Sequence, residues 1–161
     1  MKTLYLIRHA KSSWNHNLQD HDRPLNTRGF NDADLIGKIL AKQNINIDKI
    51  YSSTANRAAT TARIICEELN INLSEISYES TLYEFDYRYV YDFIKQIPDT
   101  YNSVLIFGHN TAFTDLVNKL GDRAISNLPT SGVVAIRFET EQWGVVGYGH
   151  TEKCFFPKDF K

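Results

Sequence analysis

Short apolar runs alternate with amphipathic helical patterns along this chain, and that order restricts the fold more than any other feature. Apolar, β-prone runs predict buried strands at residues 3–7, 48–52 and 103–107. Apolar residues at helical spacing predict helices at 31–43, 56–69, around 90–97, and from 108–110 to Gly121. Strands that alternate with helices favour a mostly parallel sheet covered on both faces. The predicted fold class is therefore α/β, a three-layer sandwich.

The C-terminal part departs from this alternation. Residues 133–138 and 144–148 resemble two closing strands, joined around residues 139–142 as a hairpin. A length of 161 residues with 42% hydrophobic residues suits one packed core. Because no linker, repeat or charge block divides the chain, we predict a single domain over residues 1–161.

Charge and composition argue against several classes of partner. The chain has 18 basic and 19 acidic residues, a net charge of −1, and this balance predicts neither a nucleic-acid nor a membrane partner. The apolar run near the start is too short for a signal peptide, and no run approaches the length of a membrane helix. We therefore expect a cytoplasmic protein.

Cysteine and histidine spacing gives no sign of a metal site. Cys66 and Cys154 are too far apart in sequence for a paired ligand motif, and the five histidines follow no HExxH pattern. His16, His21 and His150 are interpreted as surface residues. The sequence thus predicts no metal and no cofactor.

Charged residues follow the predicted strands at one edge of the sheet. The first strand leads to Arg8 and His9, the second leads to Arg57, and the third leads to His109. Ligands of open α/β sheets bind beyond the carboxyl ends of the strands. A single histidine or arginine at such a place is usually only a hydrogen-bonded polar group without a function. Four such residues together favour a functional site, because without a ligand each would be desolvated with no compensating interaction. Arginine binds phosphate through a planar, charged fork, so the pattern indicates an anion site with two imidazoles.

Five ordered segments resemble the histidine phosphatase superfamily, which includes the phosphoglycerate mutases. The segments are Leu6-Ile7-Arg8-His9-Ala10-Lys11-Ser12-Ser13-Trp14-Asn15, Arg23-Pro24-Leu25-Asn26-Thr27-Arg28-Gly29, Ser52-Ser53-Thr54-Ala55-Asn56-Arg57-Ala58-Ala59-Thr60-Thr61-Ala62, Leu82-Tyr83-Glu84, and Val104 to Asn110, which ends Phe107-Gly108-His109-Asn110. The short chain and the Arg-His-Ala-Lys opening are most similar to the SixA-type phosphohistidine phosphatases. The resemblance covers nearly the whole chain and implies a phosphoglycerate mutase-like fold.

The resemblance also implies roles for individual residues. His9 would be the nucleophile and carry the phosphoryl group, which requires a neutral ring whose other N–H is held by a backbone carbonyl. Arg8, Arg57 and His109 would bind the phosphoryl oxygens in place of a metal ion. Ser12 and Asn15 match positions that add neutral donors, although a role in capping the loop explains them equally well.

The proton donor for the leaving group is open between two carboxyl groups. Glu84 matches the acidic position of the family and is ranked first, whereas Asp22, beside Arg23 and Pro24, is its rival. A phosphoramidate such as phosphohistidine can be protonated on its own imidazole, and it then needs a dedicated acid less.

Chain length bears on the substrate. Only about 20 residues separate Glu84 from the strand at Val104, so no large insertion covers the site, and hydrolysis is favoured over mutase activity. The sequence therefore predicts a metal-independent phosphatase that acts on protein phosphohistidine. The alternatives are a phosphatase of small phosphate esters, and a phosphate-dependent binding module with little turnover. The aromatic residues at 83–91 are interpreted as packing of the third helix, with a substrate-recognition rim as the alternative.

Overall fold

The computed structural model describes residues 1–15 and 17–161. Its strands and helices follow one another as β1 (Lys2–Arg8), α1 (Thr27–Ala41), β2 (Lys49–Ser53), α2 (Asn56–Glu68), β3 (Ile76–Glu79), α3 (Tyr87–Lys95), β4 (Ser103–Gly108), α4 (Ala112–Leu120), β5 (Val133–Phe138) and β6 (His150–Phe155). The expected alternation of strands and helices is confirmed.

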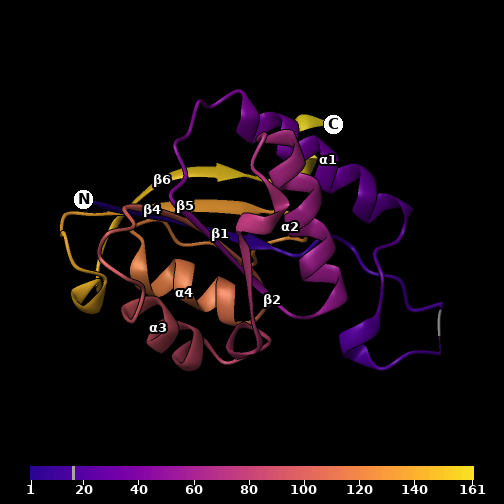
Figure 1. Cartoon of the computed structure of the whole chain (residues 1–161), viewed down its shortest axis with the longest axis horizontal. Helices are drawn as coiled ribbons and strands as arrows, with labels where there is room; N and C mark the ends of the chain where they lie inside the picture. Colours follow the sequence, from indigo (N-terminus) through magenta and orange to yellow (C-terminus); the bar gives the residue numbers. More distant parts are fainter. Residues whose placement is uncertain (16) are drawn as a thin grey trace.

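The described strands form one mixed sheet in the order β3-β2-β4-β1-β5-β6. The first four strands in this order pair in parallel, whereas β5 runs antiparallel to both β1 and β6. Figure 1 shows α1 and α2 on one face of the sheet and α3 and α4 on the other. The predicted mostly parallel, three-layer α/β architecture is therefore confirmed.

The alternation of side chains along each strand produces two separate cores. In β1, Leu4 and Leu6 pack with α3 and α4, whereas Tyr5 and Ile7 pack with α1 and α2. Successive side chains of a strand point to opposite faces, so a continuous apolar run fits a strand covered on both sides. This accounts for the run of apolar residues between Lys2 and Arg8.

The C-terminal strand lies elsewhere than predicted. Residues 144–148 do not form a strand, because Trp143–Val145 is a short 3-10 helix and β6 begins only at His150. Trp143 and Val146 are buried in the core on the α3–α4 side, so their apolar character reflects this packing and not strand pairing. The strand at Ile76–Glu79, at the opposite edge of the sheet, is a further element that periodicity did not reveal.

Candidate active site

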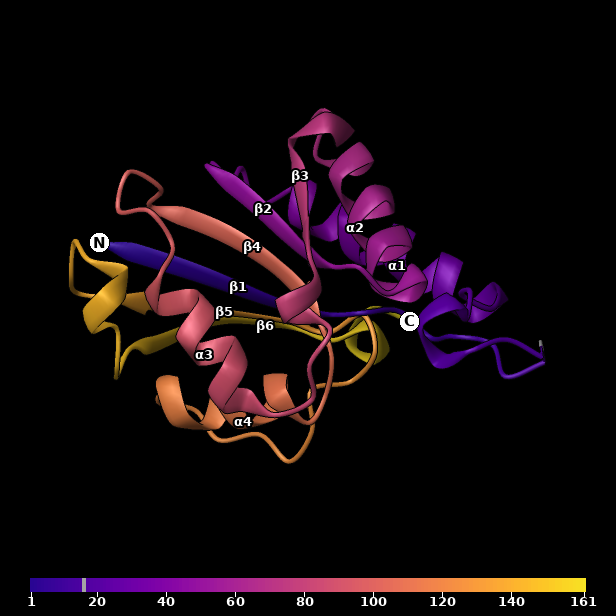
Figure 2. The ribbon, with the colours of Figure 1, turned by 60° about the horizontal axis from the view of Figure 1, so that its bottom comes forward.

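Strand register brings the two histidines together. Arg8 at the end of β1 pairs with Gly108 at the end of β4, so His9 and His109 follow a matched pair of residues. Their ring centroids are 5.2 Å apart, and the exposed fractions of the two residues are 8% and 1%. Figure 2 shows β1 and β4 side by side along their length. The expected convergence at this sheet edge is confirmed for both histidines.

A hydrogen bond to the backbone of the next residue holds His9 in one tautomer. Its Nδ1–H donates to the carbonyl oxygen of Ala10 at 2.7 Å, as the sequence analysis expected. Burial lowers the pKa of His9 from 6.5 to about 3; the bond to Ala10 opposes this effect, and Arg57, Arg8 and Arg23 add to it. The ring is therefore neutral at pH 7, and its Nε2 carries a lone pair that can attack an electrophile.

His109 presents its other nitrogen as a buried donor. Nε2 lies 2.8 Å from Ser53 Oγ, and Nδ1 is buried without a partner in the described part of the chain. When the Ser53 hydroxyl donates to Nε2, Nδ1 carries the proton and can donate to a ligand. Burial, with His9 and Arg57, lowers the pKa of His109 to about 2, so this ring is also neutral.

Two arginines each have a guanidinium group that is hydrogen-bonded through Nη1 but has no partner at Nε among the residues that the structure describes. Arg8 Nη1 donates to the carbonyl oxygen of Leu128 at 3.0 Å, and Arg57 Nη1 donates to that of Asp20 at 2.7 Å. Within the described residues, Arg8 Nε and Arg57 Nε are buried without a partner, like His109 Nδ1. Arg8, Arg57 and His109 all line one cavity, and the charge of the two arginines makes this cavity suited to an anion.

Sequence reasoning missed the site roles of Arg23 and Asp20. Arg23 is buried, and its Nη1 donates to Ser12 Oγ at 2.7 Å. Asp20 accepts from Arg23 Nη2 at 3.2 Å, from Arg57 Nη2 at 3.0 Å and from the hydroxyl of Tyr83 at 2.5 Å. Partial burial would raise the pKa of Asp20, but these hydrogen bonds lower it to about 2. Asp20 is therefore a carboxylate at neutral pH that joins two arginines.

These side chains surround a cavity of about 250 Å³. Its lining residues are Arg8, His9, Lys11, Ser12, Trp14, Asp20, Arg23, Arg57, Phe85, His109, Asn110 and Thr130. Ser12 is among these lining residues. Asn15 is exposed and is not among the lining residues, and its backbone N–H donates to Ser13 Oγ at 3.1 Å.

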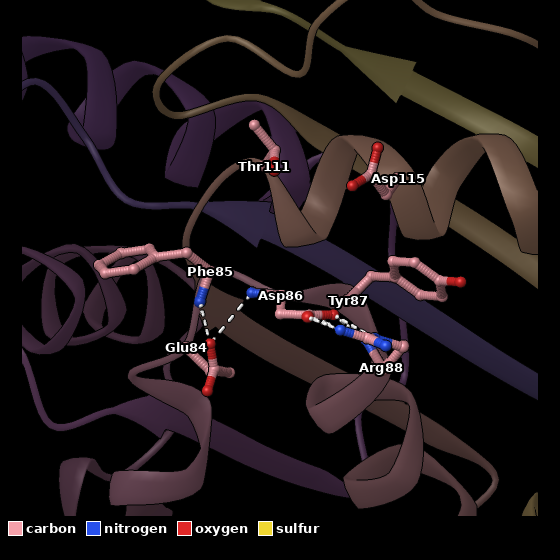
Figure 3. A pocket seen from close by; sticks show the side chains of 7 residues that line it. All are labelled: Glu84, Phe85, Asp86, Tyr87, Arg88, Thr111 and Asp115. Carbon is pink, nitrogen blue, oxygen red and sulfur yellow. Dashed lines mark hydrogen bonds and ion pairs between the residues drawn. The ribbon is translucent and has the colours of Figure 1, made fainter.

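Neither carboxyl group expected as a proton donor lines this cavity. Glu84 accepts from its neighbours' backbone N–H groups, from Phe85 at 2.7 Å and from Asp86 at 3.0 Å, as Figure 3 shows. It borders a separate hollow of about 560 Å³ at the start of α3. Asp22 is exposed and lies 3.4 Å from the ring of His21.

The aromatic cluster at residues 83–91 is divided between two environments. Tyr87 and Tyr91 pack against the core of α3 and α4, as the packing interpretation expected. Tyr83 and Phe85 instead lie edge-on to His109, with ring centroids at 5.4 and 5.3 Å. Of these two residues, Phe85 also lines the cavity that contains His9 and His109.

Of the other histidines in the described residues, neither His21 nor His150 lines the cavity. His150 is exposed and pairs with Asp122, whereas His21 is half-buried, and its Nε2 lies 2.9 Å from Thr54 Oγ1. The prediction for His16 falls outside the described residues. In the described ranges, no three His, Cys, Asp or Glu residues are grouped to hold a metal ion, and no helix is long and apolar enough to cross a membrane.

Comparison with known proteins gives consistent matches. Residues 4–90 match the model of the histidine phosphatase superfamily, branch 1. An uncharacterized protein of Mycobacterium tuberculosis is 30% identical over 141 residues, which covers 81% of this chain and 86% of that protein.

Two solved structures extend the similarity to the fold. The protein histidine phosphatase SixA, complexed with tungstate, superposes with a TM-score of 0.85 at 21% identity, over 99% of both chains. A protein from Agrobacterium tumefaciens described as SixA has a TM-score of 0.73 at 28% identity, over 84% of this chain and 90% of that one.

Proposed function

The chain belongs to the histidine phosphatase superfamily and is a histidine-type phosphatase, and from this premise we propose that it hydrolyses phosphohistidine side chains of proteins without a metal ion. One observation carries the proposal: the neutral His9, with Nε2 available, lines the same cavity as Arg8, Arg57 and His109. A nucleophile beside a set of anion donors is the arrangement that phosphoryl transfer requires.

In the first step, His9 Nε2 forms a bond to phosphorus as the bond between phosphorus and the substrate nitrogen breaks. The electron pair of the broken bond stays on the leaving imidazole. Arg8, Arg57 and His109 stabilise the negative charge on the phosphoryl oxygens. The hydrogen bond from His9 Nδ1 to Ala10 stabilises the positive charge that the phosphorylated ring acquires.

In the second step, water attacks the phosphorus atom of phosphorylated His9. The bond from phosphorus to Nε2 breaks, its electron pair returns to the ring, and orthophosphate is released. Both steps use the same anion donors, because the charge on the oxygens is similar in each transition state.

The state of the nearby carboxyl groups supports phosphohistidine as the substrate. Among the described residues, Asp20 is the one carboxyl group that lines the cavity, and it is ionised at neutral pH. An alkyl ester needs a proton on its leaving oxygen, whereas imidazole takes a proton on its own second nitrogen. A site without a carboxylic acid in contact with the leaving group therefore suits a phosphoramidate better than an alkyl ester.

The loops around the site support a substrate borne on a protein. The segment between Glu84 and β4 consists largely of α3, whose Val90 and Ile94 pack into the core. No inserted domain lies over His9 in the described residues. A phosphohistidine on another protein can therefore reach the cavity, and a cytoplasmic location remains part of the proposal.

Trapping of the phosphoenzyme tests this mechanism. Incubation with a protein that carries labelled phosphohistidine, followed by rapid quenching in base, is expected to give an acid-labile, base-stable label on this chain. His9→Ala should abolish the label, whereas the control variant His150→Ala should keep it. Turnover should persist after exhaustive treatment with EDTA, because arginines supply the positive charge.

Four outcomes contradict the proposal. Equal labelling of His9→Ala would exclude His9 as the nucleophile. Loss of turnover with EDTA that a divalent ion restores would exclude metal independence. Faster hydrolysis of a panel of small phosphate esters than of the phosphohistidine protein would favour a small-molecule phosphatase, and label without turnover would favour a binding module.

A further inference from the structure

Two exposed aromatic side chains line the same cavity as His9. The exposed fractions are 73% for Trp14 and 46% for Phe85. His9, Arg57 and His109 are buried, so an anion bound by them lies deeper in the cavity than the two exposed rings, which lie nearer its entrance. Exposed aromatic rings at the entrance of a pocket are a common means of holding a planar ligand.

Trp14 is held in place by the site itself. The guanidinium carbon of Arg23 lies 3.5 Å from the centroid of the indole ring, within the range of a cation–π contact. Arg23 is in turn fixed by its bonds to Ser12 and Asp20. The indole is therefore oriented by a buried arginine although most of its surface is exposed.

Phe85 is oriented by its ring contacts and its backbone. Its ring lies 5.3 Å from that of His109 and 5.6 Å from that of Tyr83, which is anchored to Asp20 through its hydroxyl. The carboxylate of Glu84 accepts the backbone N–H of Phe85 and so fixes the turn. Figure 3 shows the ring of Phe85 directed away from Arg88 and Asp115. This position needs several specific contacts and yet leaves nearly half of the residue exposed.

The reaction geometry determines what occupies the entrance. Displacement at phosphorus is in line, so the leaving atom lies on the side of phosphorus opposite His9 Nε2. With the phosphoryl oxygens on the buried donors, the leaving group projects toward the entrance. The first atoms of the leaving group are then the atoms that meet Trp14 and Phe85.

We propose that Trp14 and Phe85 form a ring-binding subsite that holds the leaving imidazole of phosphohistidine by aromatic contact. This inference rests on the proposed function, since it states where the leaving group of that reaction binds. The subsite selects for leaving groups that carry a planar ring, bonded to phosphorus directly or through one atom, and against leaving groups without a ring.

Two pairs of substrates test the subsite. Phosphoimidazole and unsubstituted phosphoramidate both have a P–N bond, and only the first has a ring; phenyl phosphate and ethyl phosphate form the matching pair of esters. Trp14→Ala and Phe85→Ala should each lower kcat/KM on the ring-bearing substrate of each pair about two- to tenfold, mainly by raising KM. The kcat/KM on the substrate without a ring should change less than about twofold. Trp14→Phe and Phe85→Tyr should retain most of the wild-type preference.

Matched controls separate the subsite from folding and from the phosphate pocket. Tyr89→Ala and Tyr148→Ala remove exposed aromatic rings that do not line the cavity. These variants should leave the ratio of kcat/KM between the two members of each substrate pair unchanged. Vanadate should bind the Trp14 and Phe85 variants as it binds the wild type. Equal losses on both members of each pair, or no loss on either, would overturn the subsite.

The ester pair keeps this inference distinct from the proposed function. If wild type fails to hydrolyse phosphohistidine while both variants lose their preference for phenyl over ethyl phosphate, the proposed substrate is wrong and a ring subsite exists. If phosphohistidine is hydrolysed and neither variant alters its kcat/KM, the function holds and the subsite does not.

Discussion

In the proposed reaction, Arg57 donates to the phosphoryl group whatever the leaving group is. Its Nη atoms are held by Asp20, and its unmatched Nε is buried beside the cavity. Arg57→Ala should therefore lower kcat/KM on every substrate by a factor of roughly 10²–10³, the usual effect of removing one donor to a transition-state oxyanion. Steady-state kinetics on phosphoimidazole and phenyl phosphate measures the loss.

A neighbouring arginine provides the control for this prediction. Arg63 lies in α2 as well, and its Nη2 donates to Thr60 Oγ1 outside the cavity. Arg63→Ala should leave kcat/KM within about twofold of wild type. A similarly small effect of Arg57→Ala would refute the assigned phosphate pocket.

Glu84 offers a prediction about the proton for the leaving group. Because the Glu84 carboxylate accepts backbone N–H groups and does not line the cavity, Glu84→Gln should change kcat/KM on ethyl phosphate, phenyl phosphate and phosphohistidine by less than about twofold each. Glutamine keeps an oxygen that can accept the N–H of Phe85, so the turn is preserved. A much larger loss on ethyl phosphate than on phenyl phosphate would contradict this expectation and assign the acid role to Glu84.

The sequence was sufficient to predict the site residues that directly follow strands. It was not sufficient to predict the site residues in the loop before α1. Arg8, His9 and His109 were predictable because each follows an apolar run that predicts a strand. The carboxyl ends of parallel strands lie at one edge of the sheet, so residues that follow these strands lie close together. Asp20 lies in a polar segment with another aspartate two residues on, and neither periodicity nor spacing distinguishes the two. Only the folded loop shows that Asp20, and not Asp22, meets the arginines.

At the scale of elements, α1 approaches the loop after β1 closely at Gly29. A β-carbon at Gly29 would lie 2.1 Å from the carbonyl oxygen of Lys11, a backbone atom that cannot turn aside. Gly29→Ala should therefore displace the loop that contains Lys11 and Ser12, and destabilise the protein by about 1–3 kcal/mol. Urea unfolding measures the stability, and vanadate binding reports on the displaced loop.

A second glycine is the control for this prediction. A β-carbon at Gly147 would meet no heavy atom closer than 4.0 Å. Gly147→Ala should therefore change the free energy of unfolding by less than about 0.5 kcal/mol. If the two substitutions have equal effects, the close approach of α1 to the loop does not constrain the site.

Strand prediction succeeded in the centre of the sheet and failed at its edges. The central strands β1 and β4 are buried on both faces and appear as continuous apolar runs. The edge strand β6 is half polar, with the sequence His-Thr-Glu-Lys-Cys-Phe, because one side is only partly covered. The apolar segment before it was predicted instead, although its side chains enter the core from a 3-10 helix.

For the molecule as a whole, the two buried histidines determine how acid affects stability. In the unfolded chain each imidazole binds a proton near pH 6.5, but in the folded chain only near pH 3 for His9 and pH 2 for His109. Between these values the unfolded state binds more protons. Stability should therefore be complete above pH 6.5 and fall as the pH is lowered toward 3, by up to about 1.4 kcal/mol per pH unit for each histidine.

Urea unfolding at pH 7, 6 and 5 tests this dependence. The double variant His9→Asn and His109→Asn should show a flatter decrease below pH 6.5 than wild type. His150→Asn, which alters an exposed histidine, should keep most of the wild-type decrease. An unchanged slope in the double variant would mean that other groups cause the sensitivity to acid.

The position of β1 in the sheet has a consequence for synthesis of the chain. β1 leaves the ribosome well before both of its neighbours in the sheet, β4 and β5, which come from residues 103–138. The segment Leu4-Tyr5-Leu6-Ile7 must therefore remain without a partner while most of the protein is translated. We expect nascent-chain chaperones, which bind extended apolar segments, to occupy this segment first and to release it only once β4 has emerged.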